Sequence, residues 1–318
     1  MLHLLRQGAS RLETIAVAPD WAPPADALWI DLESPSREEE LAVEQALGLD
    51  LPTREEMAQI EPSSRLYQEG GATFLTASLL ARSDGEHPAA TPVTFVLTGE
   101  LLVTIRYDHL KAFEAFAQSA LQNGKPTCGG EALMGLLEAV VERLASVLER
   151  GSARVQASSN AIFDRPRGAA FEPLLTGLSR TQSITAMAQI SLISLGRLAS
   201  FAMLADEIGG APARKAHLHS IQHDVQSLTE HSGHLGTHIS FLLDAALGLI
   251  NIEQNNIMKV FSLATVILMP PTLVGAIYGM NFVHMPELSW KLGYPMALGL
   301  MVVSGLGPAL WFKRRGWF

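Results

Sequence analysis

The chain has 318 residues, of which 48% are hydrophobic, and a formal net charge of -9. This length allows one large domain or two ordinary ones, and the negative charge argues against nucleic acid as a partner. Cys128 is the only cysteine, which excludes an intrachain disulfide and a zinc cluster of several thiolates and fits a reducing compartment.

The first part of the chain, residues 1–125, combines strand and helix signals. Ser36-Arg37-Glu38-Glu39 and Thr53-Arg54-Glu55-Glu56 each resemble a capping box that opens a helix. Apolar segments rich in strand-forming residues predict β-strands at 28–32, 72–80, 93–97 and 101–106, the last two as a hairpin. We expect a cytoplasmic α/β domain over residues 1–125.

Strand signals stop after about residue 126, and apolar residues recur at helical spacing. One helix is predicted from 131 to 163, where Pro166-Arg167-Gly168 follows, and a second from about 171 to 207. A third begins near residue 213 and meets no helix breaker before Pro270, a length of roughly 85 Å at 1.5 Å per residue. We expect a helical stalk over residues 126–258, with its last helix continuing into a membrane.

Two long uncharged runs lie near the C-terminal end. Residues 260–286 and 292–312 contain no Asp, Glu, Lys or Arg. About twenty apolar residues span the hydrocarbon core of a bilayer, so these runs predict transmembrane helices at 259–281 and 294–312. The alternative is a pair of buried helices in a soluble protein. A short loop over 282–293 would join the two spans, and a basic tail over 313–318 would follow them.

The basic residues around these runs predict an orientation. Lys259 precedes the first run and Lys313-Arg314-Arg315 follow the second, and such residues are enriched on the cytoplasmic side. The N-terminal residues lack the basic start and sustained apolar stretch of a signal peptide. We expect both termini to be cytoplasmic and the 282–293 loop to lie outside.

The first predicted span carries a stripe of small, soft or hydroxylated residues. Steps of three and four place on one helix face Asn255, Met258, Ser262, Thr265, Met269, Thr272 and Ala276. Polar positions on a spanning helix point to a bundle interior or a water-filled path, although a packing seam of small residues is an equal alternative. The stripe carries no charge and would not strip water from an ion, which suits Mg²⁺ because it dehydrates reluctantly. Two spans cannot enclose a channel, so a transport function requires an oligomer.

A motif between the two runs identifies a family resemblance. Tyr278-Gly279-Met280-Asn281-Phe282 is followed by Met285-Pro286-Glu287-Leu288. Together with Pro270-Pro271-Thr272-Leu273 and the closing Phe312-Lys313-Arg314-Arg315-Gly316-Trp317, these residues resemble the CorA family of magnesium transport proteins. The likeness is strongest over residues 240–318, and a weaker likeness that includes Trp29-Ile30-Asp31-Leu32 covers the rest.

The resemblance implies a fold and an activity. The expected fold is an α+β cytoplasmic domain with long stalk helices and two C-terminal transmembrane helices, assembled as a homopentameric funnel in the bacterial inner membrane. The implied activity is passive, voltage-driven uptake of hydrated Mg²⁺, with Co²⁺ and Ni²⁺ as minor substrates. Mg²⁺ is substrate and regulatory ligand, and no other cofactor is expected.

The resemblance also implies residue roles. The selectivity filter falls on Gly279, Met280 and Asn281, with Asn281 as the main selector. The family's narrow inner neck falls on Asn255, Met258 and Phe261, and Met269 and Thr272 match its pore-facing positions farther out. The spacing of the stripe adds Ser262 and Thr265 as pore-lining residues, and Glu287 lies in the external loop. Phe261 departs from the family, in which an aliphatic residue is common at that position.

Gating by cytoplasmic Mg²⁺ bound between subunits is implied only by the family. Residues 151–205 carry just two carboxylates, Asp164 and Glu172, where family members often have many. Candidate regulatory ligands elsewhere include Asp206, Glu207, Asp224, Glu230 and Asp244.

Histidines are concentrated between residues 217 and 238. His219/His223 and His234/His238 are one helical turn apart, a spacing that can hold a transition metal. His234 and His238 are therefore candidates for a regulatory metal site. The interpretation we favour is a solvated or intersubunit polar face, because no third ligand is evident.

Two other functions remain open. A zinc transporter of the same superfamily is one, although its members usually lack the full motif combination. A membrane-anchored enzyme or receptor is the other. No catalytic motif surrounds Asp31, Glu61, His87 or His109, so we do not expect an enzyme.

Overall fold

The computed structural model describes residues 1–9, 12–17, 21–59, 61, 65–85, 87–122, 126–164, 170–205, 208, 210–281 and 285–316. They form two compact units, Met1–Leu243 and Asp244–Phe318, and helix α8 (Pro212–Tyr278) contributes residues to both. Several positions named above lie outside the described residues: Pro166-Arg167-Gly168, Asp206, Glu207, Phe282 and Trp317.

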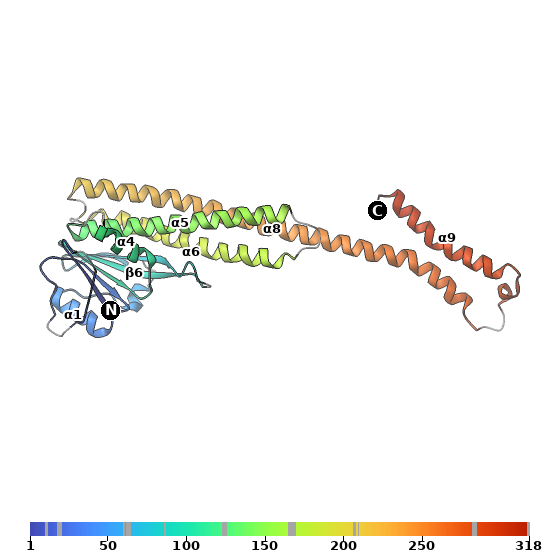
Figure 1. Cartoon of the computed structure of the whole chain (residues 1–318), viewed down its shortest axis with the longest axis horizontal. Coiled ribbons are helices and arrows are strands. Elements are labelled where there is room, and N and C mark those ends of the chain that lie inside the picture. The colour runs from blue at the N-terminus through green and yellow to red at the C-terminus, as the bar shows by residue number, and fades with distance from the viewer. Residues whose placement is uncertain are drawn as a thin grey trace. The chain divides into compact units, whose positions relative to one another are not determined.

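The first unit is built on a mixed sheet (Figure 1). The described strands are β1 (Leu2–Arg6), β2 (Glu13–Ile15), β3 (Ala27–Glu33), β4 (Leu66–Glu69), β5 (Ala72–Ala81), β6 (Ala89–Thr98) and β7 (Leu101–Arg106). Their order is β2-β1-β3-β7-β6-β5-β4, and only the β3/β7 pair is parallel. The four predicted strands are confirmed within β3, β5, β6 and β7. The predicted hairpin is confirmed too, with Thr98 paired to Leu101 across a two-residue turn.

Two short helices cover one face of the sheet. Helix α1 (Arg37–Leu47) begins at a capping box in which Ser36 Oγ accepts from Glu39 N–H and Glu39 Oε2 accepts from Ser36 N–H. Helix α2 (Arg54–Met57) begins in the same way at Thr53 and Glu56, so both predicted capping boxes are confirmed. The helices contribute Val43 and Met57 to a core that also contains Ile30, Leu32, Phe74, Val96 and Ile105.

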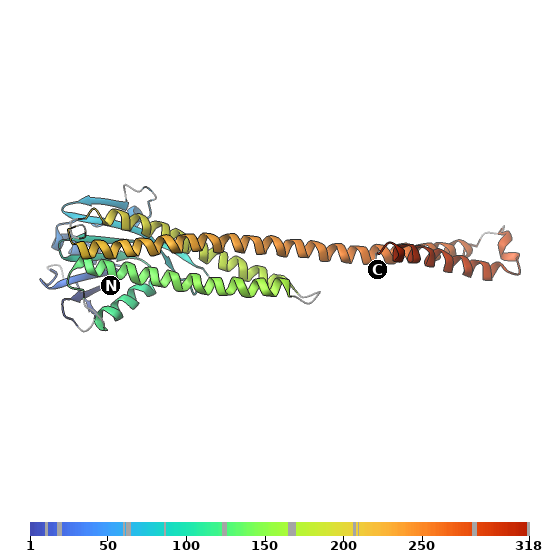
Figure 2. The same ribbon diagram turned by 90° about the horizontal axis from the view of Figure 1, so that it is seen from above.

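Longer helices cover the opposite face. These are α4 (Lys111–Gln122), α5 (Gly129–Phe163) and α6 (Glu172–Ala202), of which α5 contacts β7 and α6 contacts β5. Trp29 packs edge-on against Phe116 of α4, and its indole N–H donates to Thr104 Oγ1 at 2.9 Å. Figure 2 shows the first part of α8 running beside α5 and α6, where Leu235 and Val225 are buried. The α+β fold with long helices is thus confirmed, although α6 ends at Ala202 rather than near residue 207.

The second unit contains the rest of α8, the short 3-10 helix η1 (Pro286–Ser289) and α9 (Gly293–Arg314). Among the described residues, three helices are long and apolar enough to cross a membrane: α6, α8 and α9. The sequence predicted only the last two. In α6, 44% of the most apolar window is buried, because the helix packs against β5 and α5, whereas none of the windows in α8 and α9 is buried. The apolar side chains of α6 therefore belong to the core of the first unit.

Candidate functional site

The predicted filter triplet follows the last residue of α8. Gly279 N–H donates to Gly275 O at 3.0 Å, and Met280 N–H donates to Ile277 O at 3.3 Å. A Cβ on Gly279 would lie 3.0 Å from the Gly275 carbonyl oxygen, so a side chain would crowd this last turn. Asn281 follows at once with an exposed side chain. The amide of Asn281 therefore stands at the end of a helix whose final turn is closed by main-chain bonds.

The segment after the triplet folds onto itself. Leu288 N–H donates to Met285 O at 3.2 Å, and Gly293 N–H donates to Trp290 O at 3.0 Å. A Cβ on Gly293 would overlap the carbonyl oxygen of Glu287, so only glycine fits where α9 begins. The Glu287 side chain is half-buried. A compact turn from Met285 to Gly293 thus contains Glu287 just before α9 begins.

The predicted pore-facing residues have exposed side chains in the single chain. Met258, Phe261 and Met269 are 62%, 68% and 66% exposed. The other predicted lining residues are also exposed: Asn255, Ser262, Thr265 and Thr272. In the described part of the chain, these side chains remain exposed to solvent in a single copy.

Helix α9 packs on a different side of α8. A Cβ on Gly305 would lie 3.2 Å from Pro271 Cγ and 3.4 Å from Ile267 O, and one on Gly275 would lie 3.2 Å from Met301 Cε. Successive residues of a helix are rotated by about 100° about its axis, which places a set of half-buried residues on the side of α8 opposite the exposed stripe. These half-buried residues are Leu263, Ile267, Pro271, Val274 and Tyr278. Glycines let the two helices approach closely, as membrane helices often do. The packing seam and the uncharged stripe are therefore two different faces.

The two threonine hydroxyls on the stripe donate to carbonyl oxygens of their own helix. Thr265 Oγ1 donates to Phe261 O at 2.9 Å, and Thr272 Oγ1 donates to Met269 O at 2.8 Å. Because each hydroxyl proton is used internally, each oxygen presents its lone pairs outward. The stripe can thus accept hydrogen bonds without carrying a charge.

The candidate regulatory ligands do not meet in one copy of the chain. Asp224, Asp244, His234 and His238 are all exposed on α8, and the His238 ring stacks on Phe241 with centroids 6.5 Å apart. Among the described residues, no group of three or more His, Cys, Asp or Glu side chains could hold a metal ion. These four positions stay a prediction.

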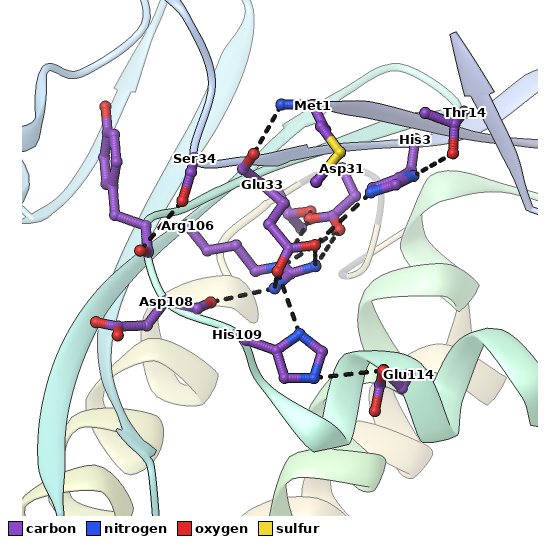
Figure 3. A network of polar contacts seen from close by, with 12 residues as sticks. Met1, His3, Thr14, Asp31, Glu33, Ser34, Arg106, Asp108, His109 and Glu114 are labelled. Carbon is purple, nitrogen blue, oxygen red and sulfur yellow. Dashed lines mark hydrogen bonds and ion pairs between the residues drawn. The ribbon is translucent and has the colours of Figure 1, made fainter. Parts of the chain in front are cut away.

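The scattered titratable residues considered for an enzyme lie in separate places. Asp31 is buried beside Arg106, which donates to both of its carboxylate oxygens and to both of those of Glu33, as Figure 3 shows. The His109 ring bridges Glu33 and Glu114 at 3.2 and 3.3 Å. Glu61 and His87 are exposed elsewhere.

Opposing effects set the pKa values in this network. Burial alone would raise the pKa of Glu33, but hydrogen bonds and charge from Arg106 and His109 hold it below its ordinary value. Burial would lower the pKa of Arg106, but the carboxylates of Asp31 and Glu33 raise it. The guanidinium also lies 5.0 Å from the centroid of the Phe113 ring. The network joins the ends of the parallel strands β3 and β7.

Sequence reasoning missed both the Arg106 network and the α8–α9 seam. A signal existed for the first, because Asp31 stands inside the apolar segment 28–32 and a buried carboxylate requires a partner. For the seam, Gly275 and Gly305 sit in the two apolar runs, but nothing in the spacing pairs them.

Comparison with known proteins places the chain in a family. A family model described as "CorA-like Mg2+ transporter protein" matches residues 24–314. The chain is 35% identical over 292 residues to the magnesium transport protein CorA of Pasteurella multocida, covering 92% of each, and 33% identical to that of Escherichia coli K12 over 100% of both. The complete structure of the CorA magnesium transporter from Methanocaldococcus jannaschii has the same fold, with a TM-score of 0.76 at 18% identity over 100% of this chain and 99% of that one. The chain belongs to the CorA-like Mg²⁺ transporter family.

Proposed function

We propose that this chain conducts hydrated Mg²⁺ passively across the bacterial inner membrane as a homopentamer, with α8 lining the pore. The observation that carries this proposal is the uncharged stripe on α8, which is exposed and faces away from α9, on the helix that leads to Asn281. The family membership supports the substrate. In this arrangement α8 and α9 span the bilayer, and both termini are cytoplasmic.

Self-association explains the exposed face. Two spans cannot enclose a pore, and large side chains on the stripe, such as Met258 and Met269, are uncovered in one copy. Five copies around an axis would bring the five stripes together, while the seam on the opposite side keeps α9 toward the lipid. The pentamer itself rests on the family resemblance.

The chemistry of the stripe fits an ion that keeps its water. Mg²⁺ dehydrates reluctantly, and its bound waters point their hydrogens outward. The hydroxyl oxygens of Thr265 and Thr272 offer only lone pairs to those waters. A ring of Asn281 amide oxygens at the outer mouth would do the same and would act as the selector, with Gly279 and Met280 shaping that mouth. The half-buried Glu287 would be the acidic group nearest the entrance along the chain.

The membrane potential would drive uptake. A divalent ion that crosses the full field gains about 4.6 kcal/mol per 100 mV, twice the figure for one charge. Closing by cytoplasmic Mg²⁺, with Asp224 and Asp244 as candidate ligands, and minor transport of Co²⁺ and Ni²⁺ are finer proposals that rest on the resemblance. His234 and His238 are the candidate ligands of a regulatory site for a transition metal.

Flux into liposomes tests the proposal. The purified chain would be reconstituted around a Mg²⁺-sensitive dye, and an inside-negative potassium diffusion potential would be applied. We expect Asn281→Ala to lower Mg²⁺ flux about tenfold or more, the factor for losing a charge-assisted hydrogen bond. Asn256→Ala is the matched control, because Asn256 is exposed on α8 but lies on the side away from the stripe. Cobalt hexammine, which mimics the hydrated ion, should compete in the wild type.

Three other results of the flux experiment would contradict parts of the proposal. Wild-type flux no greater than that of empty liposomes overturns transport and favours a membrane-anchored enzyme or receptor. Equal flux through wild type and Asn281→Ala removes Asn281 as the selector. Faster flux of Zn²⁺ than of Mg²⁺ favours the zinc-transporter alternative.

A further inference from the structure

Polar side chains cover the edge of β5 beyond its last residue pair with β4, Leu66 with Leu75. Strand β4 pairs with β5 only from Ala72 to Leu75, and β5 continues to Ala81. Beyond that point Ser78 N–H donates to Ser194 Oγ of α6 at 2.9 Å. Ser78 Oγ accepts from Arg65 Nη1 at 3.1 Å. Arg65 and α6 thus take the place of a further strand along this edge.

A small cavity lies between this edge and α6. Its volume is about 180 Å³, and its polar lining includes Arg65, Ser78, Ser194 and Arg197. Ile190 and Ile193 form part of its apolar wall. Drug-sized ligands occupy pockets of about 300–1,000 Å³, so this cavity suits a smaller molecule or ion.

The cavity carries positive charge without a counter-charge. The chain has 32 Asp and Glu residues, yet none of those that the structure describes lines this cavity or lies within ion-pair distance of Arg65 or Arg197. Burial lowers the pKa of Arg65, and the charge of Arg197 lowers it further. Arginine stays protonated at neutral pH, so this repulsion persists, but water screens it because the Arg197 side chain is exposed. Arg106 on the same sheet, by contrast, faces two carboxylates.

Hydrogen-bond donors outnumber acceptors in the cavity. A guanidinium has five N–H donors, and Arg65 uses its Nε on Gln59 O and one Nη1 proton on Ser78. Arg197 makes no hydrogen bond to any residue in the described part of the chain. The Ser194 hydroxyl accepts from Ser78, so its own proton remains to be donated.

We propose that this cavity binds a small oxyanion of the phosphate class, held between the guanidinium groups of Arg65 and Arg197 with the Ser194 hydroxyl as a third donor. Arginine binds phosphate oxygens in a bidentate, charge-assisted way, which uses the spare donors and removes the repulsion between the two cations. The site lies in the first unit and does not depend on the proposed ion pathway.

The test is a thermal-stability titration of the full chain in detergent with inorganic phosphate. Divalent cations are removed with a chelator, because they bind phosphate, and chloride holds the ionic strength constant. Binding to the folded state alone raises the melting temperature with the ligand concentration. We expect a saturable rise in the wild type and an affinity lower by about 10- to 100-fold in Arg197→Ala, since one set of charge-assisted bonds is lost. Phosphorus NMR line broadening reports the same binding directly.

Controls separate this site from general salt effects. Phosphate stabilises proteins non-specifically by exclusion from their surface, and that rise should be equal and unsaturated in every variant. Arg154→Ala is the matched control, because Arg154 is an exposed arginine on α5 away from the cavity, and it should keep the saturable rise. Arg197→Glu should raise the melting temperature without phosphate and abolish the response, because it supplies an internal carboxylate beside Arg65.

Two results overturn the proposal. One is a wild-type response that matches Arg197→Ala at every phosphate concentration. The other is loss of the oligomer in Arg197→Ala with no phosphate response in the wild type, which assigns the arginine pair to a contact between copies. Adenosine monophosphate in place of phosphate shows whether the site admits a phosphate group on a larger molecule.

Discussion

The two units treat their polar side chains in opposite ways. In the first unit, the Arg106 side chain is 4% exposed, and its N–H groups donate to Asp31, Glu33 and the Asp108 carbonyl oxygen. In the second, residues 260–286 carry no Asp, Glu, Lys or Arg, and the threonine hydroxyls bond to their own helix. A buried charge requires a counter-charge, whereas a self-satisfied hydroxyl can face lipid, a neighbouring helix or a hydrated ion. The comparison teaches that the first unit pairs a buried charge with buried or half-buried counter-charges, whereas the apolar runs of the second unit carry no charge.

Removing the charge of Arg106 should have the largest effect, a loss of stability of the first unit. Arg106→Met leaves Asp31 buried without a counter-charge, and we expect the free energy of unfolding to fall by about 3–5 kcal/mol. The midpoint of urea unfolding, followed by circular dichroism, measures the loss. Arg6→Met is the control, because Arg6 and Asp26 are 41% and 42% exposed and such a pair contributes about 1 kcal/mol or less. Similar losses in both variants contradict a special role for the buried network.

Filling the α8–α9 seam should have the next largest effect. Gly305→Leu forces a side chain against Pro271 and the Ile267 carbonyl, and overpacking of this kind costs about 1–3 kcal/mol. The melting temperature of the full chain in detergent reports it. Gly307→Leu is matched, because a Cβ at Gly307 meets no atom within 4 Å. If Gly307→Leu destabilises as much, the seam is not where the structure places it.

The smallest effect concerns acid stability of the first unit. The folded-state pKa of Glu33 lies below its ordinary 4.5, so its contribution is fully present above pH 4.5 and disappears as the pH falls through the lowered value. We expect Glu33→Gln to lose stability at pH 6 and to show a weaker fall in unfolding midpoint between pH 5 and about 3. Glu149→Gln, at an exposed position of α5, should keep the wild-type slope. An unchanged slope in Glu33→Gln argues that other carboxylates carry the acid sensitivity.

Local patterns predicted most elements of the fold. The capping boxes at Ser36 and Thr53 begin helices, and the predicted strands correspond to β3, β5, β6 and β7. These signals could be recognised because caps and strand periodicity act over a few residues. The end of α6 was predicted some five residues late, because helix ends depend on packing that periodicity does not report. The sheet order, with β3 parallel to β7 in its centre, could not be predicted, since pairing joins segments about 70 residues apart.

The sequence by itself determined the uncharged stripe, the triplet at Gly279–Asn281 and the two long apolar runs, because spacing along a single helix and the length of a run require no tertiary partner. Only the tertiary structure decided which face of α8 remains open, since Gly305 and Met301 lie on another helix. It also decided that Asp31 meets Arg106 and that Arg65 and Arg197 share a cavity without a carboxylate. Such charge balances arise between distant segments, and their energy depends on burial that no local pattern contains.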